Sequence, residues 1–278
     1  MLFEIDHLTR YEYTAPVHLG EHLLRFLPPQ LAGQHPGNCV LKVEPAPIRQ
    51  ESELDAWGNR IQRTVFQGRT RYLEIRAHLE VETVATARPV EHGGCRLAPA
   101  YGTETVVLTP YLEPLEQPER LQPFLQPLME AAGGDCLAFL DALNRAIHAF
   151  YHSGVRLEGP PRTPAQTLAL GEGVCRDLTV LFMAACRQAG VAARFVSGYQ
   201  QGDGTREARY LHAWPEVYLP GEGWCGYDPT HGTPAGTAHV AVAAAPTAEA
   251  VTPVEGGYSF RGEEITSTLT TEIRITTR

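Results

Sequence analysis

The sequence is poor in cysteine and in long apolar runs. Six cysteines among 278 residues are too few and too scattered for a disulfide scaffold. No apolar run approaches the roughly 18 residues that a membrane-spanning helix needs, and the longest weakly polar stretch, Val240–Ala245, is short. The first residues include acids where a signal peptide needs a basic start. These absences predict a cytoplasmic protein with reduced thiols. The cysteines are Cys39, Cys95, Cys136, Cys175, Cys186 and Cys225.

Basic residues are also fewer than acidic residues. The formal net charge is −9 and the isoelectric point lies near 5.7. An excess of acid argues against nucleic acid or an anionic membrane as the main partner. Hydrophobic residues make up 43% of the chain, which is enough for the core of one large or two modest domains.

Three segments of the chain differ in character. Residues 1–87 read as an antiparallel β-rich domain, because Leu73 to Val81 alternate between apolar and polar side chains with a period of two. Residues 88–135 carry many prolines and end in a Gly-Gly pair, which is typical of a connector with short helical pieces. Residues 136–278 are expected to form a core with closing C-terminal strands.

The expected elements of that core follow from apolar spacing and from turn residues. Apolar side chains at helical spacing predict a helix over Leu137–Tyr151 and a second helix that begins at or near Cys175. A Pro-Gly-Glu-Gly turn at 220–223 joins two strands as a hairpin. The expected strands are Ala193–Tyr199, His212–Leu219, Trp224–Asp228 and a closing strand from Leu269 to Ile275.

A glycine-rich turn delivers Cys175 to the start of its helix. Gly171 and Gly173 do not suit a helix interior, whereas Leu178, Leu181 and the apolar residues after them follow at helical spacing. A thiol at a helix N-terminus faces unpaired backbone N–H groups and the positive end of the dipole, and both favour the thiolate. Cys175 is therefore a candidate nucleophile.

A histidine and an aspartate occur in the order that a cysteine nucleophile needs. His212 opens the first strand of the hairpin and Asp228 ends the second, 16 residues later. The tight turn between the strands places both residues at the same end of the hairpin. A carboxylate there can accept the imidazole N–H and fix its tautomer. The helix that starts at Cys175 would have to abut that end.

These blocks resemble the bacterial transglutaminase-like proteins. The resemblance rests on Gly-Val-Cys175-Arg-Asp, Phe-Val-Ser-Gly198-Tyr, His212-Ala-Trp-Pro-Glu-Val-Tyr and Tyr-Asp228-Pro-Thr-His-Gly. Near the start, Tyr11-Glu-Tyr-Thr-Ala-Pro-Val resembles the β-rich N-terminal domain of the family, and His239-Val-Ala-Val fits its C-terminal part. The resemblance covers most of the chain and implies an α+β fold. Its core would be papain-like, with the cysteine helix packed on an antiparallel sheet.

The resemblance also implies a reaction. Cys175 would be the nucleophile, His212 the general base and acid, and Asp228 the residue that orients the imidazole. Attack on a protein or peptide amide would give a thioester that water or an amine resolves. Hydrolysis is the expected outcome, because water is the default acceptor unless a site excludes it. No cofactor is expected. The backbone N–H of Cys175 and a second donor, with Gln166 and Trp214 as candidates, would meet the oxyanion.

Two other functions stay open on the sequence. A transglutaminase-like scaffold could bind peptides without catalysis, and Cys175, His212 and Asp228 could hold Zn²⁺ as a three-ligand set. No Cys-x-x-Cys or His-Glu-x-x-His pattern supports the metal. The expected partner is a protein or peptide substrate.

Several further residues receive plainer interpretations. Asp177 in the first turn of the cysteine helix is expected to stabilise the helix dipole. Pro215 lacks an N–H, which requires a strand edge or a bulge at that position. Trp214 and Trp224 are expected in the core. Packing is also the expected role of Cys186 and Cys225, and surface or packing roles are expected of His148, His152, His231 and His239.

Overall fold

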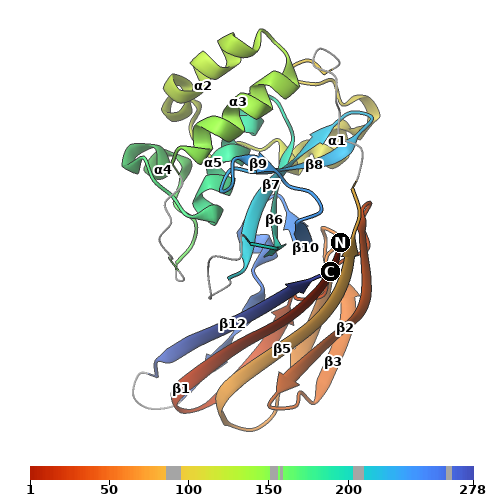
Figure 1. The fold of residues 1–278 in the computed structure, drawn as a ribbon. Helices are drawn as coiled ribbons and strands as arrows, with labels where there is room; N and C mark the ends of the chain where they lie inside the picture. The colour runs from red at the N-terminus through yellow and green to blue at the C-terminus, as the bar shows by residue number, and fades with distance from the viewer. Residues whose placement is uncertain (86–94, 151–155, 157–158, 203–209, 261–264) are drawn as a thin grey trace.

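The computed structural model describes residues 1–85, 95–150, 156, 159–202, 210–260 and 265–278. Within these residues the chain forms a long twisted sheet and, above it in Figure 1, a smaller sheet covered by helices. This α+β arrangement, with a β-rich N-terminal part, confirms the predicted fold class. Among the described residues no helix is both long and apolar enough to cross a membrane.

The long sheet is organised around β1, a strand of 23 residues. In the described residues its path runs β2-β5-β1-β4-β3, and β11 and β12 also pair with β1. Alternation along β5 buries Leu73, Ile75 and Leu79 on one face, as the period of two predicts. The strands are β1 (Leu2–Leu24), β2 (Gln34–Glu44), β3 (Arg49–Leu54), β4 (Arg60–Val65), β5 (Thr70–Thr83), β11 (Val254–Ser259) and β12 (Ser267–Thr277).

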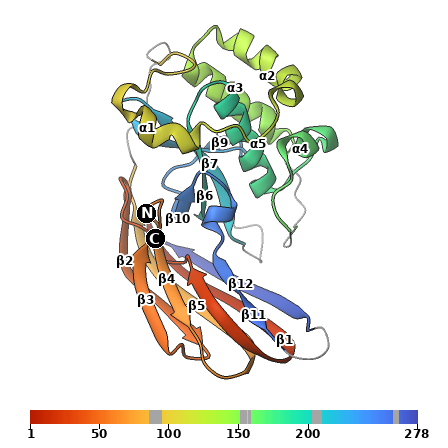
Figure 2. The same cartoon turned by 180° about the vertical axis from the view of Figure 1, so that it is seen from behind.

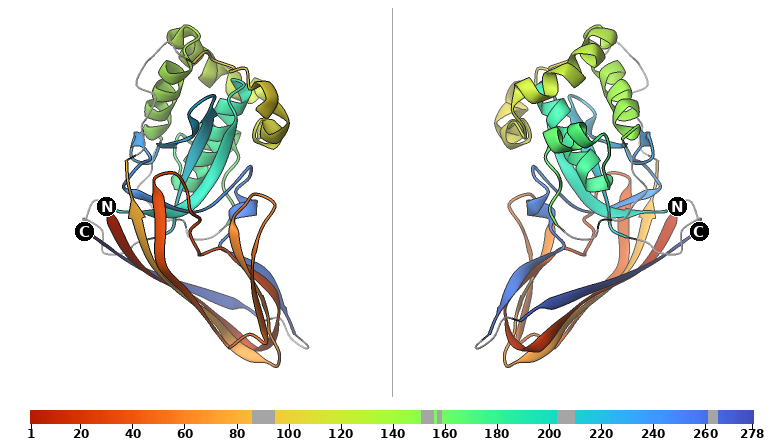
Figure 3. Two further views of the ribbon diagram at one scale, coloured as in Figure 1. Left: turned by 90° about the vertical axis from the view of Figure 1, so that its right-hand side faces the viewer. Right: turned by 90° about the vertical axis from the view of Figure 1, so that its left-hand side faces the viewer.

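The C-terminal strands lie in this sheet rather than in the core, where the sequence had placed them. β12 pairs with β1 from Phe3↔Thr277 to Tyr13↔Ser267, and β11 pairs with the far end of β1. The two views in Figure 3 show β12 running alongside β1. A period-two pattern identifies a strand but not its partner, and only the three-dimensional path of β1 exposes an edge for both strands.

One element of the expected connector is a long helix. α2 (Pro118–Ala132) contains Pro123 and Pro127 but continues for 15 residues. Both prolines are exposed, so water can bond the carbonyl groups that lack an N–H partner. Leu121 and Leu125 on the opposite face are buried. Shorter pieces precede it, namely η1 (Gly102–Glu104), α1 (Thr105–Leu108) and η2 (Thr109–Tyr111). Part of the expected connector, residues 88–94, lies outside the described residues.

The core packs helices on one face of the smaller sheet, whose order in the described residues is β10-β6-β7-β8-β9. Leu178, Leu181 and Phe182 of α5 are fully buried in this core. The helix predicted from Leu137 is α3, which ends at His148, and Tyr151 lies outside the described residues. The elements are α3 (Cys136–His148), α4 (Pro164–Leu170), α5 (Cys175–Gln188), β6 (Ala193–Gln200), β7 (His212–Leu219), β8 (Gly223–Asp228), β9 (Thr233–Pro234), β10 (His239–Ala245) and η3 (Glu249–Val251).

Figure 2 shows β10, the edge strand of the core sheet, next to the long sheet. Two amide side chains join this strand to the N-terminal part of the chain. Gln34 donates to the carbonyl of Ala241 at 2.9 Å and accepts from its N–H at 2.7 Å. Asn59 bonds both backbone groups of Ala244 in the same way, at 3.1 Å and 2.7 Å. Each primary amide therefore takes the place of a missing neighbouring strand, and the edge of the core sheet is closed.

Replacing Gln34 by alanine should destabilise the protein. Gln34 is 5% exposed and Ala241 is 8% exposed, so the variant leaves two buried backbone groups unpaired at a cost of about 1–3 kcal/mol. Urea unfolding measures the loss. Gln126→Ala is the matched control, since Gln126 is exposed and its amide donates to Glu130 on the surface of α2. Equal effects of the two substitutions would contradict this account of the junction.

Candidate active site

The turn before α5 places Cys175 as the sequence predicts. Gly171 ends α4 with a positive φ of 65°, a conformation that favours glycine. A Cβ on Gly173 would lie 3.0 Å from the Cβ of Asp177, which leaves little room for a side chain. Val174 is extended and α5 begins at Cys175. The thiol is half-buried at the first helical position, where backbone N–H groups have no partner within the helix.

Asp177 holds this turn in place. Its carboxylate is fully buried and accepts from the N–H of Val174 at 3.1 Å and from the N–H of Arg162 at 2.8 Å. It also forms an ion pair with Arg156. The carboxylate lies in the first turn, as expected for a group that stabilises the dipole, and its bonds also fix the backbone that precedes Cys175.

His212 and Asp228 meet at one end of the β7–β8 hairpin. The Nε2–H of His212 donates to Oδ2 of Asp228 at 2.9 Å. The His212 side chain is 10% exposed and that of Asp228 is fully buried. Trp214 stacks on His212 with ring centroids 5.9 Å apart. The structure therefore brings the two residues together as the hairpin geometry predicts.

Cys175 interacts with the other side of the same imidazole. Burial raises the pKa of the Cys175 thiol, but the hydrogen bond and charge of His212, the N–H of Ala213 and the charge of Arg176 outweigh it, and the net shift is downward. Because Nε2 of His212 bonds Asp228, Nδ1 is the nitrogen that faces the thiol. This arrangement stabilises a thiolate beside an imidazolium.

The pKa values of His212 and Asp228 shift in opposite directions. Burial lowers the pKa of His212, but the charge and hydrogen bond of Asp228 and the contact with Cys175 raise it to about 10. For Asp228, burial raises the pKa, while the charge of His212 and the bonds from His212, His231 and His239 bring it below its usual range. The aspartate is therefore charged and the histidine is protonated at neutral pH.

Two histidines that the sequence analysis assigned to surface or packing roles contact the same carboxylate. His231 Nδ1 lies 2.7 Å from Asp228 Oδ2, and His239 Nε2 lies 2.9 Å from the same oxygen. They follow Asp228 by 3 and 11 residues, and neither spacing is that of a metal-ligand pattern. The turn after β8 and the place of β10 in the sheet bring them there. His148 packs as expected, with Nδ1 3.0 Å from the carbonyl of Pro229, and His152 lies outside the described residues.

The two side chains considered as a second oxyanion donor make other contacts in the structure. Gln166 is exposed, and its carbonyl oxygen accepts from the N–H of Thr163 to close the capping box of α4. Trp214 is 2% exposed and packs over Gly198, where an added Cβ would lie 2.8 Å from the indole. The N–H of Ala213 already points at the Cys175 sulfur. The backbone thus supplies one N–H donor to the sulfur.

The remaining expectations concern Pro215, the cysteines and Trp224. Pro215 lies opposite Phe195 of β6, and the β7–β8 ladder ends beside it at Glu216↔Gly226, so pairing with β8 stops where the N–H is missing. Cys186 is buried in the core and Cys225 packs against it. Trp224 is half-buried and packs beside Tyr111, with ring centroids 4.9 Å apart.

The Zn²⁺ alternative can be tested on the geometry of the donor atoms. Within the part of the chain that the structure describes, His212, Asp228 and His231 have possible ligand atoms within 4.8 Å of one another, and Cys175 is not in that group. The histidine nitrogens of the group face Asp228 Oδ2 as hydrogen-bond donors. The donor set proposed from the sequence therefore does not fit a zinc centre.

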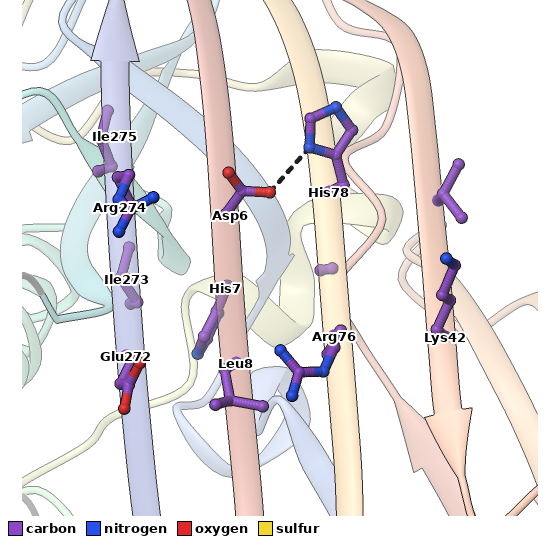
Figure 4. A pocket seen from close by; sticks show the side chains of 12 residues that line it. Asp6, His7, Leu8, Lys42, Arg76, His78, Glu272, Ile273, Arg274 and Ile275 are labelled. Carbon is purple, nitrogen blue, oxygen red and sulfur yellow. Dashed lines mark hydrogen bonds and ion pairs between the residues drawn. The ribbon is translucent and has the colours of Figure 1, made fainter.

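A separate hollow of about 710 Å³ lies on the long sheet and contains none of the residues Cys175, His212 and Asp228 (Figure 4). Four strands line it, namely β12, β1, β5 and β2. His78 and Asp6 interact across its floor at 2.9 Å. Asp6 also lies directly opposite Arg274. Charges of both signs pair across the strands, which is typical of the solvated face of a sheet.

A cysteine at a helix N-terminus, packed against an antiparallel sheet that supplies a histidine and an aspartate, defines a papain-like fold of the transglutaminase-like class. Residues 3–82 match the family model described as the bacterial transglutaminase-like N-terminal region, and residues 134–229 match that of the transglutaminase-like superfamily. The two matches together span well over half of the chain. The chain therefore belongs to the transglutaminase-like superfamily, as the sequence motifs predict.

Similar proteins agree with this assignment. A stretch of 66 residues is 36% identical to the protein-glutamine gamma-glutamyltransferase of Pseudomonas aeruginosa, covering 21% of this chain and 10% of that one. A stretch of 96 residues is 34% identical to the uncharacterized protein ML0607 of Mycobacterium leprae, covering 32% and 33%. The chain thus spans a third or less of these relatives.

A solved structure shares the whole fold. It is described as a candidate cysteine protease from Cytophaga hutchinsonii and aligns with 99% of this chain and 90% of its own, with a TM-score of 0.71 and 20% sequence identity. At that identity the likeness shows a common fold.

Replacing His212 by alanine should make Cys175 a weak nucleophile. The variant loses the two largest influences that lower the pKa of the thiol and keeps only the weaker ones of the Ala213 N–H and the Arg176 charge against burial. The pKa therefore rises, and each unit of rise lowers the thiolate fraction about tenfold. We expect alkylation of Cys175 by iodoacetamide at pH 7 to slow by about tenfold or more. Mass spectrometry of the Cys175 peptide measures the rate.

Cys39 gives an internal reference for this experiment, because burial raises the pKa of its thiol. In the unaltered protein Cys175 should react faster than Cys39. His78→Ala is the matched control, since His78 also bonds an aspartate but lies on the long sheet. An unchanged Cys175 rate in the His212 variant would show that the imidazole does not activate the thiol.

Proposed function

We propose that the protein is a cysteine-dependent enzyme that acts on protein or peptide amide bonds through a thioester. Peptidase or amidase activity, with water as the acceptor, is the reaction we favour. The observation that supports the proposal is the continuous contact from Cys175 through His212 to the buried carboxylate of Asp228. The lowered pKa of the thiol supplies the nucleophile at neutral pH.

The first half of the reaction forms the thioester. The Cys175 sulfur attacks the carbonyl carbon of the amide, and the carbonyl electron pair moves onto oxygen. The first backbone N–H groups of α5, including that of Cys175, would stabilise that oxyanion. His212 gives its Nδ1 proton to the amide nitrogen, the C–N bond breaks, and the amine or ammonia departs.

The second half releases the enzyme. Neutral His212 accepts a proton from an attacking water or amine, which adds to the thioester carbonyl. The C–S bond then breaks and leaves the thiolate beside the imidazolium. Asp228 keeps the imidazole in the tautomer that presents Nδ1 to these groups throughout.

Transfer to an amine is the second candidate. The stretch that is 36% identical to a protein-glutamine gamma-glutamyltransferase favours it. In that case the substrate carboxamide belongs to a glutamine side chain, ammonia leaves first, and an amine replaces water in the second half.

A scaffold that only binds peptides is supported less well. A buried charge destabilises a fold unless hydrogen bonds compensate it. Asp228 is fully buried, and its bond to His212 contributes to a protonated imidazole next to a thiol. Peptide binding alone does not call for such an arrangement.

Incubation with a peptide mixture and a labelled primary amine should separate the reactions. We expect mass spectrometry to find cleaved or deamidated peptides, with loss of all products in Cys175→Ala. Labelled glutamine side chains would instead indicate amine transfer. Cys225→Ala is the matched control and should stay active, because Cys225 is half-buried outside the site.

The proposal is wrong if the unaltered protein gives no product and an electrophilic amide analogue forms no adduct with Cys175. Peptide binding under those conditions would favour the non-catalytic scaffold.

A further inference from the structure

Asp228 accepts more hydrogen bonds than a carboxylate needs in order to orient one histidine. Its Oδ2 accepts from rings of His212, His231 and His239 at 2.9, 2.7 and 2.9 Å. Its Oδ1 accepts from the backbone N–H of Thr230 at 3.0 Å and of His231 at 3.3 Å. Three imidazoles thus share a single oxygen of the carboxylate.

The positions of the protons follow from these contacts. An ionised carboxylate only accepts, so each of the three nitrogens that face Oδ2 carries a hydrogen. His239 accepts from the N–H of Gly236 through Nδ1 at 3.2 Å, which makes it the neutral Nε2–H tautomer. Its burial, the largest influence, also lowers its pKa. His239 therefore donates one neutral N–H to Asp228 and uses both of its nitrogens.

His231 differs from His239 in exposure. Its side chain is 40% exposed, while that of His239 is 6% exposed. Its Nδ1–H donates to Asp228, so Nε2 lies on the far side of the ring. The centroids of His231 and His212 are 5.5 Å apart, and the two rings meet edge to face. A substitution at His231 therefore removes a donor to Asp228 without leaving a cavity in the core.

The turn that carries His231 is fixed against α3. The carbonyl of Pro229 is bonded by Nδ1 of His148, and the carbonyl of Thr233 accepts from the amide of Asn144 at 3.1 Å. Gly232 has a φ of 67°, and a Cβ there would lie 3.0 Å from the His148 ring. The backbone of the turn is thus held against α3, and the bond to Asp228 holds the His231 ring.

We propose that His231 is a positioning residue that shares the charge of Asp228 with His212 and thereby keeps the His212 imidazolium acidic enough to release its proton. This inference rests on the proposed function, in which His212 must give that proton to the departing amine. Each N–H on Oδ2 withdraws part of the negative charge that would otherwise bind the proton of His212 more tightly. Removing one donor therefore makes the imidazolium a weaker acid.

The groups that face His231 determine whether the pKa of His212 rises or falls when His231 is replaced. They are Asp228 at the end of β8, His212 of β7 and His239 of β10, while His148 of α3 packs under the same turn and Cys175 of α5 lies beyond His212. Loss of the His231 N–H leaves Asp228 charged, with its bonds to His239 and to the Thr230 N–H in place. The pKa of His212 should then rise.

The pH dependence of Cys175 alkylation reads this pKa without a substrate. The rate rises first as the thiolate forms beside the imidazolium, and again at higher pH when His212 loses its proton and the thiolate is no longer paired. In His231→Ala we expect the upper inflection to move up by about one pH unit, a tenfold change in the acidity of His212. The kcat for amide substrates should fall while KM stays within about twofold.

Two further variants separate this role from a structural one. In His231→Asn the amide nitrogen takes the place of Nδ1 and can still donate, so the upper inflection should stay where it is. In His231→Gln the amide nitrogen takes the place of Nε2 and cannot reach Asp228, so the inflection should move as in the alanine variant. If His231→Ala does not fold, these two variants carry the test. His78→Asn, which alters a histidine–aspartate pair on the long sheet, is the control.

The direction in which the upper inflection moves in His231→Ala tests the inference. An upper inflection that stays in place, or moves to lower pH, would overturn the inference, because the second result means that Asp228 has swung away from His212. An unaltered protein whose Cys175 alkylates like an ordinary thiol would instead contradict the proposed function itself.

Discussion

The buried carboxylate of Asp228 is the group on which the site depends. It lies at the end of β8, fully removed from solvent, where a charge is unfavourable unless it is paired and hydrogen-bonded. The fold meets that requirement with two backbone N–H groups on one oxygen and three imidazoles on the other. One imidazole comes from β7, one from the turn after β8 and one from β10. The carboxylate therefore also links three strands of the core sheet.

The long sheet contributes to this site although it supplies no reactive group. β10 carries His239 at its start, and its edge is closed by the amides of Gln34 and Asn59. His7 of β1 adds a buried bond to the hydroxyl of Tyr199 on β6, at 2.9 Å. The strand that positions His239 is thus held from both sides, by β6 within its sheet and by side chains from the other sheet.

The sequence predicts the parts of the site that depend on local order. Cys175, His212 and Asp228 lie at the start of a helix or at the ends of one hairpin, and turn residues identify all three places. His231 and His239 were missed because their contact depends on a turn and on a strand that joins the sheet from a distant segment. The C-terminal strands were misplaced for the same reason. The helix α2 was missed because proline usually interrupts a helix, and only the packing shows that both prolines of α2 face water. Local patterns specify elements, whereas the partners of an element come from packing.

The pairing of β1 with β12 has a consequence for biosynthesis. Phe3 lies opposite Thr277, so β1 receives this neighbour only after all of the residues between them have been synthesised. Contacts between such distant residues slow folding, because a long loop must close before they form. Until then this side of β1 offers unpaired backbone groups, which favour pairing with other chains and aggregation.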